Sequence, residues 1–162
     1  MPQQTLTAAF TGHRTYDHSA DDQLCDTVES LYNDGYRHFR IGMAEGFDLA
    51  AGEAVLRLMA NHDDICLELC IPYPNFNRGF GIEENIRYNS IISKASVIRY
   101  AADSYHKSVF SLRNNMLVDR ADTVVAWYSS KRGGTHYTIN RARRYGVRII
   151  NLYPDPQFNI SF

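Results

Sequence analysis

Residues 123–145 read TVVAWYSSKRGGTHYTINRARRY, and this stretch decides the fold class. Its first part, Thr123–Trp127, consists of β-branched, apolar and aromatic residues, which predicts a buried strand. A glycine-containing loop over 131–134 follows, and the pattern of Thr135–Tyr145 predicts a helix. A strand that leads through a short loop into a helix is the repeating unit of parallel sheets.

The same alternation extends over the whole chain. Further strands are predicted at Leu6–Phe10, His38–Ile41, Ile65–Ile71, Val97–Tyr100 and Val147–Leu152. Further helices are predicted between them, at 21–33, 47–61, 83–93 and 107–120. Because parallel strands separated by helices are joined by right-handed crossovers, the sequence predicts a Rossmann-like α/β sandwich of three layers, with a mainly parallel sheet of about six strands.

The predicted strand Ile65–Ile71 carries a carboxylate. Apolar side chains alternate along one of its faces, and Glu68 lies on the other. A central parallel strand is covered on both faces and is usually apolar on both. We therefore expect Glu68 to be incompletely buried and this strand to lie near an edge of the sheet.

Length and composition are typical of an ordinary globular protein. The 162 residues fit a single domain over 1–162, with 44% hydrophobic and 22% charged residues. No apolar run approaches the roughly 20 residues that a membrane-spanning helix needs. The first residues, MPQQTLTAAF, lack the basic start and long apolar run of a signal peptide. We expect no contact with a membrane.

The positions of the cysteines and histidines argue against disulfides and against a metal site. Cys25, Cys66 and Cys70 occur without CxxC spacing. Cys66 and Cys70 lie in one predicted strand about 13 Å apart, whereas a disulfide needs Cα atoms within about 7 Å. We therefore predict free thiols and a cytoplasmic protein. The histidines show no metal-ligand spacing, so we expect neither a metal nor a cofactor.

Charge is distributed unevenly along the chain. The net charge is −1, but residues 1–70 carry 12 acidic and 4 basic side chains, whereas residues 71–162 carry 6 acidic and 13 basic ones. The basic second half can face an anionic ligand, or the two halves can attract each other within one globule. Residues 131–148 contain no acid, which fits either a solvated helix face or a nucleic-acid contact.

Three predicted strand-to-helix junctions contain glycine: Thr11–Arg14, Gly42–Asp48 and Gly133–Thr135. Glycine permits positive φ and close approach of a ligand, and the helix that follows offers free N–H groups to a phosphate. Because the carboxyl ends of parallel strands meet at one edge, we predict that these junctions surround a shared anion-binding crevice. Each junction alone also fits an ordinary turn, with Asp48 or Thr135 as a helix cap. Neither GxGxxG nor GxxxxGK[ST] occurs.

Arginine and histidine side chains near these junctions are candidate anion ligands. Arg14 follows the glycine of the first junction, and Arg113 lies beside Asn114 on the helix before Thr123. A guanidinium offers a fixed fork of donors that suits phosphate. His13 and His136 lie in candidate loops and can also donate to an anion. An alternative for Arg113 is a surface ion pair with one of two nearby aspartates, Asp119 and Asp122.

The junctions occur in an order that resembles the YpsA-like branch of the SLOG superfamily. This superfamily of Rossmann-like proteins joins the Lonely Guy cytokinin-activating hydrolases to the DNA-processing protein A family. The resemblance covers about residues 7–150. It rests on TGHR at 11–14, GMAEGFDLAAGEAV at 42–55, RNNMLVDRADTVVAWY at 113–128 and GGTHYTINRA at 133–142.

The resemblance implies a pocket for a nucleotide or a nucleotide-derived ligand, with phosphate and ribose held by the loops 42–48 and 133–135. It also implies a possible homodimer, since relatives pair through helices. Together with the junctions, it gives an expected set of ligand-binding residues: Thr11, Gly12, His13, Arg14, Gly42, Met43, Ala44, Glu45, Gly46, Asp48, Arg113, Asn114, Gly133, Gly134 and Thr135.

One position departs from the related hydrolases. They carry PGGxGTxxE, whose glutamate acts in cleavage of the N-glycosidic bond, whereas this chain has Thr138 in that place and no proline before the glycines. A threonine cannot act as a carboxylate acid or base near neutral pH. Catalysis would therefore depend on Asp48 or Glu45, together with Arg113.

Three functions remain in order of preference. The first is a module that binds or senses a nucleotide-derived ligand. The second is a hydrolase that cleaves a nucleotide N-glycosidic bond, which the missing glutamate disfavours. The third is single-stranded DNA binding as in the DNA-processing relatives, which the total charge near zero disfavours.

Overall fold

The computed structural model describes residues 5–154, so residues 1–4 and 155–162 of the predicted domain lie outside the described part. Within this range the sequence forms an alternating series of strands and helices. The elements are β1 (Leu6–Gly12), α1 (Asp21–Asn33), β2 (Tyr36–Ile41), α2 (Phe47–Met59), β3 (Cys66–Ile71), the 3-10 helix η1 (Phe76–Gly79), α3 (Ile82–Lys94), β4 (Val97–Tyr100), α4 (Val109–Val118), β5 (Thr123–Trp127), α5 (Gly134–Arg144) and β6 (Arg148–Asn151).

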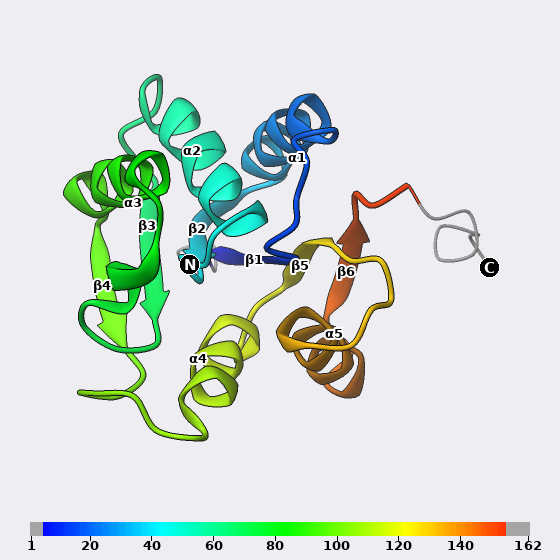
Figure 1. Ribbon diagram of the computed structural model, residues 1–162. Coiled ribbons are helices and arrows are strands. Elements are labelled where there is room, and N and C mark those ends of the chain that lie inside the picture. The colour runs from blue at the N-terminus through cyan, green and yellow to red at the C-terminus, as the bar shows by residue number, and fades with distance from the viewer. Residues whose placement is uncertain (1–4, 155–162) are drawn as a thin grey trace.

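The strands form one six-stranded sheet in the order β4-β3-β2-β1-β5-β6, and every pairing is parallel. Helices α1, α2 and α3 cover one face, and α4 and α5 cover the other (Figure 1). This arrangement confirms the predicted three-layer Rossmann-like sandwich. The chain moves outward from β1 to β4 and then returns to place β5 on the other side of β1.

Amphipathic spacing explains why these segments form their elements. Helix α1 has the predicted bounds and buries Leu24, Val28 and Leu31, which recur along one helical face. All five residues of β5 are buried, as its β-branched, apolar and aromatic character predicts for a strand inside a parallel sheet. Helix α4 is two residues shorter at each end than the predicted helix over 107–120.

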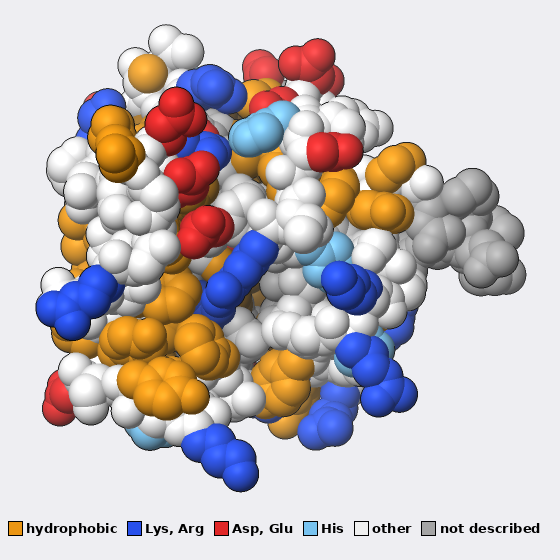
Figure 2. Space-filling view, viewed as in Figure 1, with side chains coloured by type: hydrophobic (Ala, Val, Ile, Leu, Met, Phe, Trp, Pro, Cys, Tyr) orange, Lys and Arg blue, Asp and Glu red, His pale blue; other side chains and the backbone are white. Residues whose placement is uncertain are grey.

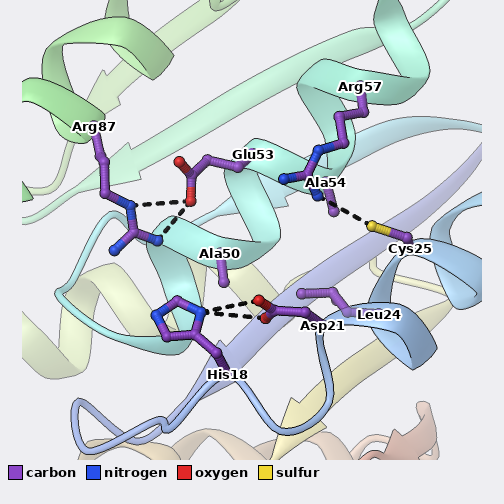
Figure 3. Close-up of a pocket in the computed structure, with 9 residues that line it drawn as sticks. All are labelled: His18, Asp21, Leu24, Cys25, Ala50, Glu53, Ala54, Arg57 and Arg87. Atoms are coloured by element: carbon purple, nitrogen blue, oxygen red, sulfur yellow. Dashed lines mark hydrogen bonds and ion pairs between the residues drawn. The ribbon is translucent and has the colours of Figure 1, made fainter.

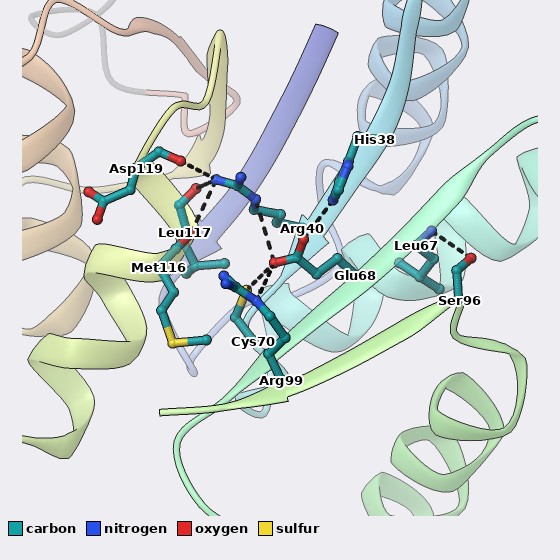
Figure 4. A network of polar contacts seen from close by, with 10 residues as sticks. All are labelled: His38, Arg40, Leu67, Glu68, Cys70, Ser96, Arg99, Met116, Leu117 and Asp119. Atoms are coloured by element: carbon teal, nitrogen blue, oxygen red, sulfur yellow. Dashed lines mark hydrogen bonds and ion pairs between the residues drawn. The ribbon is translucent and has the colours of Figure 1, made fainter. Parts of the chain in front are cut away.

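The expectation that Glu68 is incompletely buried is wrong. Strand β3 lies next to the edge strand β4, yet Glu68 is only 5% exposed. Its carboxylate pairs with His38 Nε2 at 2.7 Å, Arg99 Nε at 3.0 Å and Arg40 Nε at 3.6 Å (Figure 4). Burial alone would raise the pKa of Glu68, but these partners and the Cys70 thiol outweigh it and hold the pKa at about 2.

Candidate functional site

A cleft opens at the carboxyl edge of the sheet, where the strand order reverses between β1 and β5. Open α/β sheets bind ligands at this kind of position. Its volume of about 450 Å³ lies in the range of small-molecule sites. The cleft is lined by Thr11, Gly12, His13, Arg14, Thr15, Ala44, Asp48, Phe110, Arg113, Asn114, Leu117, Lys131, Arg132, Gly134 and Thr135.

All three glycine-containing junctions contribute to this one cleft, and most of the expected ligand-binding residues line it. Those that line it are Thr11, Gly12, His13, Arg14, Ala44, Asp48, Arg113, Asn114, Gly134 and Thr135. Five expected residues are not part of its lining: Gly42, Met43, Glu45, Gly46 and Gly133.

The glycines of the first two junctions allow close packing within the protein. A Cβ on Gly12 would collide with the side chain of Phe47, and one on Gly46, whose φ is +81°, would lie 2.5 Å from Arg14 O. These contacts bring the β1 and β2 junctions together. Gly133 differs: its φ is +143°, and a Cβ there would meet no heavy atom within 4 Å. Of these three, Gly133 is the glycine that borders open space.

Arg113 is buried, and the alternative of a surface ion pair with Asp119 or Asp122 is wrong. Asp119 instead pairs with Arg141 at 2.9 Å. Asp122 accepts a hydrogen bond from the backbone N–H of Thr7 at 2.8 Å. Both aspartates are therefore engaged elsewhere.

Two hydrogen bonds hold the Arg113 guanidinium in place. Its Nη1 donates to Gly42 O, and its Nε donates to Asn114 Oδ1 at 2.8 Å. Burial lowers the pKa of Arg113, and the nearby Asp48 carboxylate opposes this effect. Among the described residues no hydrogen-bond partner is found for Nη2, which leaves one edge of the fork for a ligand.

Asp48 lies in the first turn of α2 and is 4% exposed. Its Oδ2 accepts a hydrogen bond from the Ala44 N–H at 3.1 Å, whereas within the described part of the chain Oδ1 has no partner in hydrogen-bond geometry. It does not cap α2, whose cap residue is Gly46. Burial raises the pKa of Asp48 to about 6, although Arg113, the Ala44 amide, Arg14 and the Gly12 amide each lower it.

His13 connects the first junction to the third. Its Nε2 accepts the backbone N–H of Ser129 at 3.0 Å and lies 3.0 Å from the Ser129 hydroxyl. The ring proton therefore resides on Nδ1. Burial, and then Lys131, lower the pKa of His13, which favours a neutral imidazole. His13 thus positions the loop after β5, and its Nε2 is not free to donate to an anion.

Sequence reasoning missed several residues of the lining. Phe110 and Leu117 lie on the same face of α4 as Arg113 and Asn114, at i, i+3, i+4 and i+7 spacing. This helical period was a usable signal, because the helix was predicted. Thr15 carried no comparable signal. Lys131 and Arg132 belong to the acid-free stretch 131–148, which was interpreted as a solvated helix face or a nucleic-acid contact and not as part of the nucleotide site.

A second cavity, of about 340 Å³, lies between α1 and α2 and also includes Arg87 of α3 (Figure 3). Its polar groups contact each other. His18 pairs with Asp21 at 3.0 Å, Arg87 with Glu53 at 2.5 Å, and Arg57 donates to Cys25 Sγ at 3.3 Å. Because these groups already have partners, the cleft at the carboxyl edge is the better candidate for ligand binding.

The described residues were expected to contain neither a disulfide nor a metal site. Cys25, Cys66 and Cys70 are free thiols, as predicted. Residues 5–154 contain no cluster of three or more His, Cys, Asp or Glu side chains placed to hold a metal ion. Over the same residues, no helix combines the length and apolar character that would let it cross a membrane.

The chain is similar in sequence to a known protein family and to two bacterial proteins. A family model described as the YspA SLOG family matches residues 9–152. An uncharacterised SPbeta prophage-derived protein, YoqJ of Bacillus subtilis strain 168, is 24% identical over 155 residues, which cover 86% of this chain and 91% of YoqJ. A UPF0398 protein of Bacillus thuringiensis strain Al Hakam is 23% identical over 122 residues, which cover 74% of this chain and 66% of that protein.

Two solved structures share the fold. DNA processing protein A from Streptococcus pneumoniae superposes with a TM-score of 0.66 at 21% identity, over 90% of this chain and 49% of that one. The Helicobacter pylori protein, described for its single-stranded DNA binding mode, gives 0.65 at 18% identity, over 89% and 63%. This chain therefore spans about half and about three fifths of the length of those two chains.

Proposed function

This chain belongs to the YpsA SLOG family, and from that premise we propose that its cleft binds a nucleotide or nucleotide-derived ligand as a sensor or binding module. One observation carries the proposal. Asp48, a buried carboxylate whose Oδ1 has no hydrogen bond among the described residues, lines the same cleft as four cationic side chains. These cationic residues are Arg14, Arg113, Lys131 and Arg132.

The cationic side chains and the carboxylate of this lining require different groups on one ligand. Four cations favour an anion such as phosphate, and the start of α5 adds free N–H groups beside Gly134. A buried carboxylate needs hydrogen-bond donors, which the hydroxyl groups of a sugar supply. A phosphorylated sugar carries both kinds of group, and this is the common part of nucleotides.

Arg14→Ala provides a test that leaves the fold intact. Arg14 is exposed and lines the cleft, so its loss should remove a charge-assisted contact to phosphate. We expect the Kd for AMP, measured by calorimetry, to rise about tenfold or more. Arg148→Ala is the matched control, because Arg148 is an exposed arginine at the amino end of β6. Equal affinity in all three proteins, or no AMP binding to wild type, would contradict the proposal.

Hydrolysis is supported by one observation, the pKa of Asp48 near 6, because a group that titrates near neutral pH suits acid–base chemistry. The other candidate carboxylate, Glu45, is not in the lining. Thr138, in the place of the hydrolase glutamate, is fully buried and donates its hydroxyl proton to Gly134 O at 2.9 Å. Release of free adenine during incubation with AMP, NAD or ADP-ribose would make the protein an enzyme.

Single-stranded DNA is the other candidate ligand, because the Helicobacter pylori neighbour is described for binding it. The exposed Lys131 and Arg132 at the cleft can contact a phosphate backbone. We expect weak binding of an oligo-dT strand with only a modest dependence on salt, since the cleft holds few cations to neutralise phosphates. Binding at physiological salt that is tighter than binding of AMP would place single-stranded DNA first.

A further inference from the structure

An aromatic cluster extends from the cleft along the same edge of the sheet. The Phe110 ring, which lines the cleft, lies 6.3 Å from the ring of Tyr105 and 6.0 Å from that of Phe76. The ring of Tyr73 lies 6.1 Å from that of Tyr105 and 5.7 Å from that of Phe76. Four rings from two segments, 73–76 and 105–110, thus pack against each other through edge-on and tilted contacts.

The cluster has an inner part and an outer part. Phe76 is 8% exposed and belongs to the core, whereas Phe110 is half-buried and Tyr105 is 64% exposed. Figure 2 shows hydrophobic side chains gathered over the start of α4 and the loop before it, beside a hollow bordered by Lys and Arg side chains. The core rings therefore support two outer rings that face solvent next to the cleft.

Helix α4 sets the order of groups along this edge. Phe110 comes one turn, about 5 Å, before Arg113 on the same helical face. Asn114 and the start of α5 lie on the other side of Arg113, since Asn114 Nδ2 is 3.5 Å from Gly134 O. The lining thus changes from cationic at α5 to aromatic at the start of α4.

We propose that the ring of Tyr105 stacks on the base of the bound nucleotide, and that Phe110, whose ring is tilted by 60° to that of Tyr105, packs against the edge of the base. This inference rests on the proposed function, because it assigns the base to one end of a cleft whose other end takes the phosphate. Stacking of a base on an aromatic ring contributes about 1–3 kcal/mol and tolerates every base, since each has a π-face. The ligand class is then a base-containing nucleotide rather than a plain sugar phosphate, with larger purines favoured over pyrimidines.

Tyr105→Ala tests the stacking surface with two probes, AMP and ribose 5-phosphate. Because Tyr105 is exposed, its removal should leave the fold unchanged. We expect the Kd for AMP to rise about tenfold, within the range for one stacked base, and the Kd for ribose 5-phosphate to stay the same. Tyr105→Phe keeps the ring and should match wild type. Tyr145→Ala, which removes another tyrosine that is 61% exposed, is the control.

The outcomes separate this inference from the proposed function. Wild-type binding of both probes with equal affinity, unchanged in Tyr105→Ala, would overturn the stacking surface and leave the anion cleft in place. An equal loss for both probes would also overturn it, because Tyr105 would then act on the phosphate end. If wild type binds neither probe, the proposed function fails and the stacking surface fails with it.

Discussion

Replacement of Glu68 by Gln is expected to lower the free energy of unfolding by about 3 kcal/mol at pH 7. The carboxylate is buried among His38, Arg40 and Arg99, and the amide of glutamine offers those groups no negative charge. Removal of one partner from a buried ion cluster leaves the others desolvated and unbalanced. Denaturant unfolding followed by circular dichroism measures the change.

The stability difference between wild type and Glu68→Gln should decrease as the pH falls. The pKa of Glu68 is lowered from the ordinary 4.5 to about 2, so its stabilising contribution is present above pH 4.5 and is lost as pH falls toward 2. The difference in stability between wild type and Glu68→Gln should therefore shrink over that interval. Glu83→Gln, a change at an exposed glutamate in the first turn of α3, is the control. Equal unfolding midpoints at pH 7 would show that the cluster makes no net contribution.

The burial of Glu68 could not be predicted from the sequence, although the fold could. Alternation of apolar runs and helical patterns was enough for the strands, the helices and the parallel sheet. Burial of a charge depends on partners from other strands, and these come from the sheet order. His38 on β2 and Arg99 on β4 reach Glu68 because β3 lies between those strands in register. No local pattern in residues 65–71 contains that information.

The candidate site was predictable to a similar extent. Strand-to-helix junctions identified the edge of the sheet, because parallel strands place their carboxyl ends together. Side-chain direction was not predictable at the second junction, where Glu45 is not part of the cleft lining and Asp48 is. The turn there depends on Gly46 packing against the backbone of Arg14, a contact between segments that are 32 residues apart in sequence.

Asp48→Asn is expected to raise the free energy of unfolding by about 2–3 kcal/mol at pH 7 and to weaken AMP binding about tenfold. Burial raises the pKa of Asp48 from 3.8 to about 6, so the ionised carboxylate destabilises the fold at neutral pH. The oxygen of asparagine can still accept the Ala44 N–H, which keeps the 3.1 Å hydrogen bond that Asp48 Oδ2 accepts. The variant therefore loses a charge without losing that contact.

The raised pKa of Asp48 also determines how the effect of Asp48→Asn on stability changes with pH. A carboxyl whose pKa is raised contributes stability below pH 3.8, and this contribution is lost as pH rises through about 6. The advantage of Asp48→Asn over wild type should therefore grow between pH 4 and 7, whereas Asp22→Asn, at an exposed aspartate of α1, should show no such trend. A less stable variant at pH 7 would make Asp48 a structural residue. A more stable variant that binds AMP as tightly as wild type would remove Asp48 from the ligand site. We expect greater stability together with weaker AMP binding, because the Asp48 carboxylate destabilises the fold and contributes to ligand binding.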